Sequence, residues 1–290
     1  MCYLEAANLN IYKKTDLNRF LMYSLDNFFV TSAPQQSLIV GSYDLFLVIL
    51  SIILATTASF VALHFASMTK VIQNNHHRHI AIIAGASIFA GGVWSMHFVG
   101  MLAYEMSEQT TYNIPLTLIS ILPSLIASYI TLRMLVNPAM TLWQLIISSL
   151  SVGAGIGMMH YVGMEAMEMD ADLRYVPSWF FASIIVAVVL AFIALSAHHY
   201  LTKFWKQHSV HLINIISALV MGLAISGVHY TGMAAARFIM SDDTLMPHRI
   251  TEDHVQLSYV ITSITLLLIA LAITIASQLR YRQLLTEKNQ

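Results

Sequence analysis

Seven long stretches of the chain contain no charged side chain, and this pattern constrains the fold more than any other feature of the sequence. A helix needs roughly 20 apolar residues to cross about 30 Å of hydrocarbon, and the stretches are about that long. Only 10% of the residues are charged and 57% are hydrophobic, whereas a soluble domain carries about 25% charged residues. The sequence therefore predicts an all-α membrane protein, a seven-transmembrane-helix bundle built from repeated helical hairpins. The expected spans are Asp44–Ala66, Ile80–Tyr104, Ile114–Leu135, Leu142–Met164, Trp179–Tyr200, Leu212–Ala235 and Leu257–Leu279.

These spans divide the chain into three parts. Residues 1–43 contain charges that interrupt their apolar segments, so we expect an N-terminal extension that is either an interfacial helix or disordered. Residues 44–280 form the membrane domain, and residues 281–290 form a short cytoplasmic tail. Because so few residues follow the last span, we expect no output domain and no enzymatic activity in this chain.

Lysine and arginine are distributed unequally between the two sets of connections, and cytoplasmic loops carry the excess of these residues. One set, taken with the C-terminal tail, holds Lys70, Arg78, Arg133, Lys203, Lys206, Arg280, Arg282 and Lys288. The other set holds only Arg174, Arg237 and Arg249. This asymmetry predicts an N-terminus outside the cell and a cytoplasmic C-terminus. The net charge of -1 and the absence of a basic run predict that nucleic acid is not a partner.

One short motif occurs three times along the chain. It reads WSMHFVGM at residues 94–101, GMMHYVGM at residues 157–164 and SGVHYTGM at residues 226–233. The spacing between copies corresponds to one helical hairpin per repeat, so each copy falls at the outer end of an outward-running helix. His97, His160 and His229 are therefore predicted to lie at one depth and to converge.

Each copy carries a methionine four residues after its histidine, on the same face of the helix. Met101, Met164 and Met233 thus offer a thioether beside each imidazole. Because Cys2 is the single cysteine, neither a thiolate cluster nor an internal disulfide can form. Neutral imidazole and soft thioether donors favour copper, Cu(I) in particular, over hard cations, whereas zinc prefers thiolate, imidazole and carboxylate.

Other residues near the motifs admit more than one interpretation. Eight residues after each histidine come Glu105, Glu168 and Arg237, which either hydrogen-bond the ligands or lie in the headgroup region. Two histidine clusters at the cytoplasmic connections are expected to be solvated: His76, His77 and His79, and His198, His199, His208 and His211. The motif itself also has a purely structural interpretation, since membrane histidines form interhelical hydrogen bonds and methionine fills gaps. Three copies in register favour the metal site.

The threefold pattern resembles the MHYT family of bacterial integral-membrane sensor domains, over about residues 41–282. The resemblance implies a seven-helix domain of the bacterial cytoplasmic (inner) membrane that binds copper and senses a diatomic gas, O₂, CO or NO. Family members are often fused to cyclic-dinucleotide enzymes or kinases, which implies a cytoplasmic signalling partner in trans for this chain. Phe98 and Val228 depart from the family pattern at a tyrosine and a methionine. The implied metal ligands are Met96, His97, Met101, Met159, His160, Met164, His229 and Met233.

Three functions remain open from the sequence. The first is a copper-dependent gas or redox sensor. The second is an electron-transfer protein in which paired histidines bind haem, although three histidines at one depth fit this less well. The third is a metal-ion transporter with a methionine-rich entrance, but the intervening helices offer few polar ligands to continue a pathway. Homo-oligomerisation within the lipid bilayer is left open.

Overall fold

The computed structural model describes residues 28–30, 38–69, 72–106, 110–137, 140–205 and 209–240, with the isolated positions 263, 267 and 274. Within these ranges six helical spans are long and apolar enough to cross a membrane. They agree with the first six expected spans to within five residues at each end. The spans are α2 (Leu45–Met68), α3 (Asn75–Leu102), α4 with α5 (Ile114–Ile119 and Ile121–Leu135), α6 (Leu142–Glu165), α7 (Pro177–Phe204) and α8 (Val210–Ala235).

The seventh expected span, Leu257–Leu279, lies outside the described residues apart from the three isolated positions. The tail at residues 281–290 and most of residues 1–43 also lie outside them. The expected seven helices, and the expected sides of the two termini, therefore stay predictions.

The third span differs from its prediction because it consists of two helices that meet at Ser120. Pro123 lies at the start of α5 and has no amide hydrogen to donate to the carbonyl of Ile119, four residues earlier. The Ser120 amide still donates to the Leu116 carbonyl at 2.9 Å, so the chain keeps its direction across the break.

Polar side chains cap the first turns of five spans, where helical amides have no partner within the helix. The Asp44 side chain accepts a hydrogen bond from the Leu47 amide at 3.0 Å, and Asn113 accepts one from Leu116 at 3.1 Å. The other caps are Asn74, Thr141 and Ser209. The helix α7 begins instead with Pro177, which has no amide hydrogen to satisfy.

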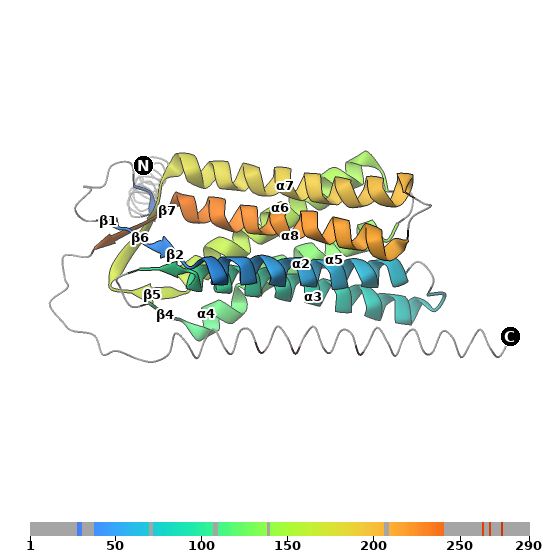
Figure 1. Ribbon diagram of the computed structural model, residues 1–290, viewed down its shortest axis with the longest axis horizontal. Helices are drawn as coiled ribbons and strands as arrows, with labels where there is room; N and C mark the ends of the chain where they lie inside the picture. The colour runs from blue at the N-terminus through green and yellow to red at the C-terminus, as the bar shows by residue number, and fades with distance from the viewer. Residues whose placement is uncertain are drawn as a thin grey trace, which may run out of the picture.

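Short antiparallel strands join the two ends of each hairpin at one end of the bundle (Figure 1). β2 (Ser42–Tyr43) pairs with β3 (Tyr104–Glu105), β4 (Thr110–Tyr112) pairs with β5 (Met167–Met169), and β6 (Ala171–Tyr175) pairs with β7 (Ala236–Met240). β1 (Leu38–Ile39) adds to the free edge of β7. The described residues thus form three β-α-α-β repeats, and the all-α prediction was wrong in this respect. Strands of two to five residues are too short to produce a recognisable alternation in the sequence.

One backbone hydrogen bond recurs at the same place in every repeat. The residue before the first helix donates its amide to a carbonyl at the end of the second helix. The pairs are Asp44 with Ala103 at 2.8 Å, Asn113 with Ala166 at 2.8 Å, and Val176 with Ala235 at 2.9 Å. The three hairpins are therefore closed in the same way at the end that carries the strands.

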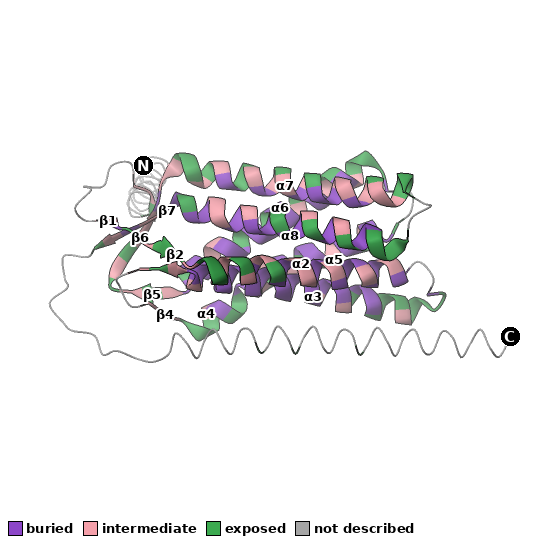
Figure 2. Ribbon diagram, in the orientation of Figure 1, coloured by how far each residue is buried: buried purple, intermediate pink, exposed green. Residues whose placement is uncertain are grey.

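The helices form two rings around a common centre. The helices α3, α6 and α8 contact one another, while each outer span packs between two of them: α2 between α3 and α8, α5 between α3 and α6, and α7 between α6 and α8. The helix α3 is the most enclosed of the six spans, since 83% of the residues in its most apolar segment are buried, compared with 28% in α7. Figure 2 shows buried residues concentrated along α3. The motif-bearing helices are therefore the three inner ones.

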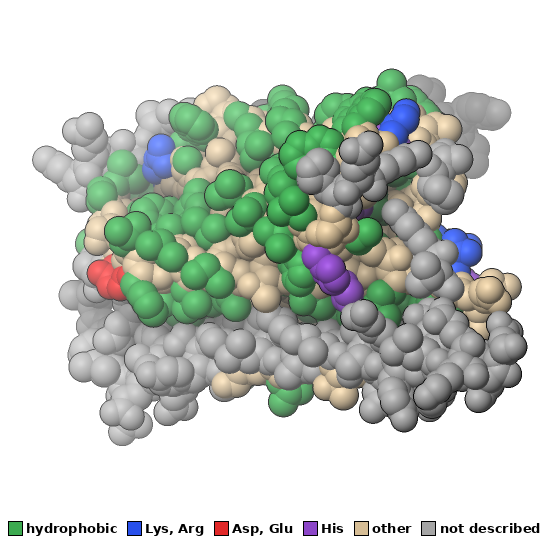
Figure 3. Space-filling model, turned by 45° about the vertical axis from the view of Figure 1, so that its right-hand side comes forward, with side chains coloured by type: hydrophobic (Ala, Val, Ile, Leu, Met, Phe, Trp, Pro, Cys, Tyr) green, Lys and Arg blue, Asp and Glu red, His purple; other side chains and the backbone are tan. Residues whose placement is uncertain are grey.

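The outward faces of the described helices are apolar, as a bilayer requires. Isoleucine and valine side chains such as Ile53 on α2, Ile126 on α5 and Ile185 on α7 are more than half exposed. Figure 3 shows hydrophobic side chains spread over one face, with the charged ones toward its two ends. The protein is a multi-pass membrane protein.

One expectation about the other histidines was wrong. His198 is buried rather than solvated, and its Nδ1 lies 3.2 Å from the Ser217 hydroxyl on α8. Because the residue falls on the inward face of α7, it takes part in α7–α8 packing. His211 is exposed, as expected.

Candidate metal centre

The three motif histidines meet at the centre of the inner ring. His97 lies on α3, His160 on α6 and His229 on α8, each five or six residues before its helix ends. At 1.5 Å per residue, this places them about 8 Å inside the end of the bundle that carries the strands. All three are at least 98% buried. The predicted convergence of the histidines is present in the structure.

The rings face one another through their Nδ1 atoms. The Nδ1 of His97 lies 3.1 Å from that of His160 and 3.2 Å from that of His229. The planes of the three pairs are inclined by 80° to 86°, and the ring centroids are 4.9 to 5.2 Å apart. The imidazoles therefore form a three-bladed arrangement around one point, with approximate threefold symmetry.

Hydrogen bonds among the rings cannot satisfy this arrangement. A neutral Nδ1 either carries one hydrogen or offers one lone pair, directed outward in the plane of its ring. The Nδ1 of His97 faces two others, and it cannot make a well-directed bond to both. Because buried polar groups are normally paired, this leaves at least one of the three nitrogens without a well-directed hydrogen bond among the rings, and the arrangement is one that fits a cation accepting three lone pairs.

The opposite edge of each ring lies against a glycine of the next repeat. His97 faces Gly163 on α6, His160 faces Gly232 on α8, and His229 faces Gly100 on α3. A Cβ built on any of the three would overlap the Nε2 atom and lie 2.7 or 2.8 Å from Cδ2 of that ring. The three Nε2 atoms are buried and make no hydrogen bond of normal geometry among the described residues. Each ring thus fits between its own helix and the backbone of the next.

The aromatic residue after each histidine packs edge-on against it, with centroids 4.8 or 4.9 Å apart. In two repeats its hydroxyl reaches a serine on an outer helix. Tyr161 lies 2.5 Å from Ser183 on α7, and Tyr230 lies 3.1 Å from Ser51 on α2. Both serines are the seventh residue of their span. These contacts tie the histidine-bearing helices to the outer ring.

Phe98 cannot make this contact in the first repeat, but Trp94 makes an equivalent one. The seventh residue of the third span is Ser120, and Trp94 Nε1 donates to its hydroxyl at 3.0 Å and to the Thr117 carbonyl at 3.0 Å. Sequence reasoning missed Trp94, although its place one turn before His97 was a usable signal. The departure at Phe98 is thereby explained.

The methionines at the fourth position after each histidine form one layer. Met101, Met164 and Met233 are buried in a single hydrophobic cluster with Tyr175 and Phe238, on the side of the histidines that faces the strands. Burial in this cluster raises the pKa of the Tyr175 phenol, so this group stays neutral. The three methionines thus gather in one cluster, and their role as ligands stays a prediction.

Met96 and Met159 lie elsewhere. They belong to the larger cluster in the interior of the bundle, together with Val228, which occupies the same position in the third copy. The valine shows that this position packs in the cluster without a sulfur atom. Met96 and Met159 thus belong to a different hydrophobic cluster from Met101, Met164 and Met233.

The charged residues that follow each motif do not surround the histidines. Glu105 and Glu168 are exposed on β3 and β5, and Glu168 accepts a hydrogen bond from Asn113 at 3.1 Å. Arg237 on β7 donates to the carbonyls of Ala234 and Ala236. Within the described residues no carboxylate joins the three histidines.

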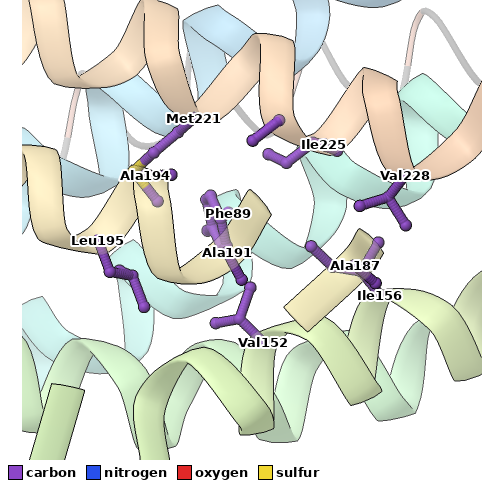
Figure 4. A pocket seen from close by; sticks show the side chains of 11 residues that line it. Phe89, Val152, Ile156, Ala187, Ala191, Ala194, Leu195, Met221, Ile225 and Val228 are labelled. Atoms are coloured by element: carbon purple, nitrogen blue, oxygen red, sulfur yellow. The ribbon is translucent and has the colours of Figure 1, made fainter. Parts of the chain in front are cut away.

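A small cavity lies on the inner side of the histidines, among α3, α6, α7 and α8 (Figure 4). Its volume is about 10 Å³, and every side chain that lines it is apolar. Ile156 and Ile225 come one turn before His160 and His229, and Phe89 comes two turns before His97. One water molecule would barely fit and would find no hydrogen-bond partner there.

The residues fit the metal that the sequence predicts. Two nitrogens bound 2.0 Å from one tetrahedral ion are about 3.3 Å apart, close to the observed 3.1 and 3.2 Å. The nearby donors are neutral imidazoles with a layer of thioethers, and no thiolate or carboxylate accompanies them among the described residues. This donor set suits a soft monovalent ion better than a hard dication.

Comparison with known proteins finds a repeat that occurs three times, once for each copy of the motif. The family model described as MHYT, bacterial signalling protein N terminal repeat, matches residues 91–148, 153–209 and 222–287. No solved structure matches the chain.

Three curated bacterial proteins are similar to this chain. The signaling protein YkoW of Bacillus subtilis is 38% identical over 68% of this chain and 24% of its own length. From Pseudomonas aeruginosa, the bifunctional diguanylate cyclase/cyclic di-GMP phosphodiesterase MucR is 35% identical over 82% of this chain and 34% of its own length, and the cyclic di-GMP phosphodiesterase NbdA is 32% identical over 75% and 28%. The chain spans about a quarter to a third of each relative. Each of the three family matches begins within one of the motif-bearing helices α3, α6 and α8 and contains one copy of the motif, and together they cover more than half of the chain. The chain therefore belongs to the MHYT family of bacterial signalling proteins.

Proposed function

We propose that this protein is a sensor of the bacterial inner membrane that binds one copper ion, as Cu(I), through His97, His160 and His229. The observation that carries the proposal is the meeting of three buried imidazoles, in which the Nδ1 atoms of His160 and His229 lie 3.1 and 3.2 Å from that of His97, with no carboxylate beside them among the described residues. Cu(I) is weakly hydrated and soft, so neutral nitrogen and sulfur donors can offset the loss of its water shell. The thioether layer of Met101, Met164 and Met233 supports entry from the side of the strands.

The sensed signal is a diatomic gas or a change of redox state. Copper bound by three imidazoles supplies a further coordination position for a ligand such as O₂, CO or NO. The side chains around the small cavity beside the histidines are all apolar, and they support an uncharged ligand because they offer no group that could pair with a polar or ionic one. His97, His160 and His229 hold the ion, and the surrounding apolar side chains exclude water from it.

The output is cyclic di-GMP signalling through a cytoplasmic partner. This part of the proposal rests on the names of two relatives, a diguanylate cyclase/phosphodiesterase and a phosphodiesterase. Ligand binding at the inner ring would change the packing of α3, α6 and α8, and these helices run to the opposite end of the bundle. The orientation expected from lysine and arginine places that end in the cytoplasm.

The first experiment measures metal in the protein purified anaerobically in mild detergent. We expect about one copper per chain in the wild type and none in the variant that carries His97→Ala, His160→Ala and His229→Ala. His76→Ala, which removes an exposed histidine from α3, is the matched control and should keep its copper. On the copper-loaded protein, infrared spectra under CO should show one bound CO stretch that the triple variant lacks.

The methionines separate ligands from packing residues in the same experiment. Met164→Leu keeps the volume and should weaken Cu(I) retention, whereas Met96→Leu should leave it unchanged. Copper retained by the triple histidine variant, or zinc in place of copper in the wild type, would contradict the proposal. An intense Soret band in the purified protein would instead support haem, although the cavity beside the histidines, of about 10 Å³, is far too small for a porphyrin.

A further inference from the structure

The three motif glycines occupy the positions that decide where each imidazole can lie. Gly100, Gly163 and Gly232 each come three residues after a histidine, yet none contacts the histidine of its own repeat through the position of its missing side chain. Each faces the ring of the repeat before it, and the order closes because Gly100 of the first repeat faces His229 of the third. The same contact occurs at all three junctions.

Two further observations concern the two edges of each ring. The Nε2 edge of each imidazole is enclosed and makes no hydrogen bond of normal geometry within the described residues, so its position depends mainly on the glycine backbone that it lies against. The Nδ1 edge of the same ring faces the shared point. A Cβ on the glycine would require the ring to move by roughly 1 Å. This movement would either push the Nδ1 atom of the ring toward the Nδ1 atoms of the other two histidines or turn it away from them.

We propose that Gly100, Gly163 and Gly232 are positioning residues for the histidines of the neighbouring repeats, and that they select Nδ1 rather than Nε2 as the metal-binding atom. The metal part of this inference rests on the proposed function, whereas the pairing of each glycine with one histidine does not. The functional unit is accordingly a histidine from one repeat with a glycine from the next.

The first test measures Cu(I) affinity by competition with a chromophoric chelator. Gly163→Ala should lower the affinity at least tenfold, because its Cβ displaces the His97 ring. The matched control is Gly157→Ala, which lies on the same helix within the same motif and has no atom within 4 Å of the added Cβ. It should bind Cu(I) as the wild type does. A Gly163→Ala protein whose affinity stays within twofold of the wild type overturns the inference.

The second test uses no metal and examines the pairing directly. Gly163→Ala should lower Tm in the wild-type background and in the His229→Ala background, but not in the His97→Ala background, where the obstructing ring is gone. Gly100→Ala should give the reverse pattern: it should lower Tm in the wild-type and His97→Ala backgrounds, but not in the His229→Ala background. Equal losses in all backgrounds would show general crowding and would overturn the pairing. If the wild type binds no copper while this pattern holds, the proposed metal fails and the positioning role stands.

Histidine nitrogen NMR of the metal-free protein supplies a spectroscopic readout. In Gly163→Ala the chemical shifts of the His97 ring nitrogens should change more than those of the remote His76 and His211. In the control Gly157→Ala the chemical shifts of all three histidines should stay as in the wild type. Unchanged signals for His97 would contradict a displaced ring even if Tm falls.

Discussion

Trp94 fills in the first repeat the place that a tyrosine hydroxyl fills in the other two. Its indole N–H reaches the serine of the third span from one turn before His97, while Tyr161 and Tyr230 reach their serines from one residue after the histidine. The same tie between inner and outer helices is therefore made by two different side chains. A hydroxyl at position 98 is not needed, because the indole N–H of Trp94 already donates a hydrogen bond to Ser120.

This equivalence predicts similar costs for removing either donor. Trp94→Phe deletes two hydrogen bonds and part of a buried ring, and should lower the free energy of unfolding by about 1–3 kcal/mol. Tyr161→Phe deletes one bond and should cost about 1 kcal/mol. Thermal unfolding in detergent measures both. Trp143→Phe is the control, since Trp143 is 69% exposed and should cost nothing; a Trp94→Phe protein as stable as this control would contradict the assigned role.

Among the elements, the α2–α8 interface closes the ring of repeats, because it joins the first hairpin to the third. It contains a close approach at Gly222, where a Cβ would overlap the hydroxyl of Thr56 and lie 2.9 Å from its Cα. The backbone of Thr56 cannot move away as a flexible side chain could. Small residues at membrane helix contacts allow such approaches.

Gly222→Ala should therefore destabilise the protein by about 1–3 kcal/mol, as overpacking does. Gly157→Ala should instead stabilise it by up to about 1 kcal/mol, because alanine restricts the unfolded chain and meets no obstacle there. The difference in Tm between the two variants measures the effect. Equal Tm values would mean that α2 and α8 are not in close contact at this point.

The elements also show which features the sequence could predict. Apolar length alone located six spans, and the spacing of the motif brought His97, His160 and His229 together. The strands could not be foreseen, because pairs such as Ser42–Tyr43 with Tyr104–Glu105 are defined by partners distant in the chain. The contact between Gly163 and His97 joins different helices, so a motif read along one helix cannot reveal it. The break at Ser120 had a visible cause in Pro123 but was not predicted.

At the scale of the whole molecule, the side of the membrane on which the histidines lie decides what reaches them. The lysine and arginine distribution predicts that the strands and the metal centre are outside and that the start of α3 is inside. Cysteine labelling tests this cleanly, because Cys2 is the single cysteine and Cys2→Ser gives a background without thiols.

In that background Asp170→Cys, an exposed position between β5 and β6, should react with a membrane-impermeant maleimide in spheroplasts. Gln73→Cys, an exposed position just before α3, should react only after the cells are permeabilised. The reverse labelling pattern would invert the topology and place the metal centre toward the cytoplasm.

The cyclic order in which each glycine receives the histidine of the preceding repeat has a consequence for ancestry. Because the third junction closes onto the first, three identical copies of one β-α-α-β hairpin could assemble with true threefold rotational symmetry and build the same centre. A gene encoding a single hairpin would then specify a homotrimer. Triplication and fusion of that gene would give one chain whose three repeats could diverge in sequence. A designed chain with three identical hairpins should consequently fold, whereas a chain with two should leave two open junctions and an incomplete ring.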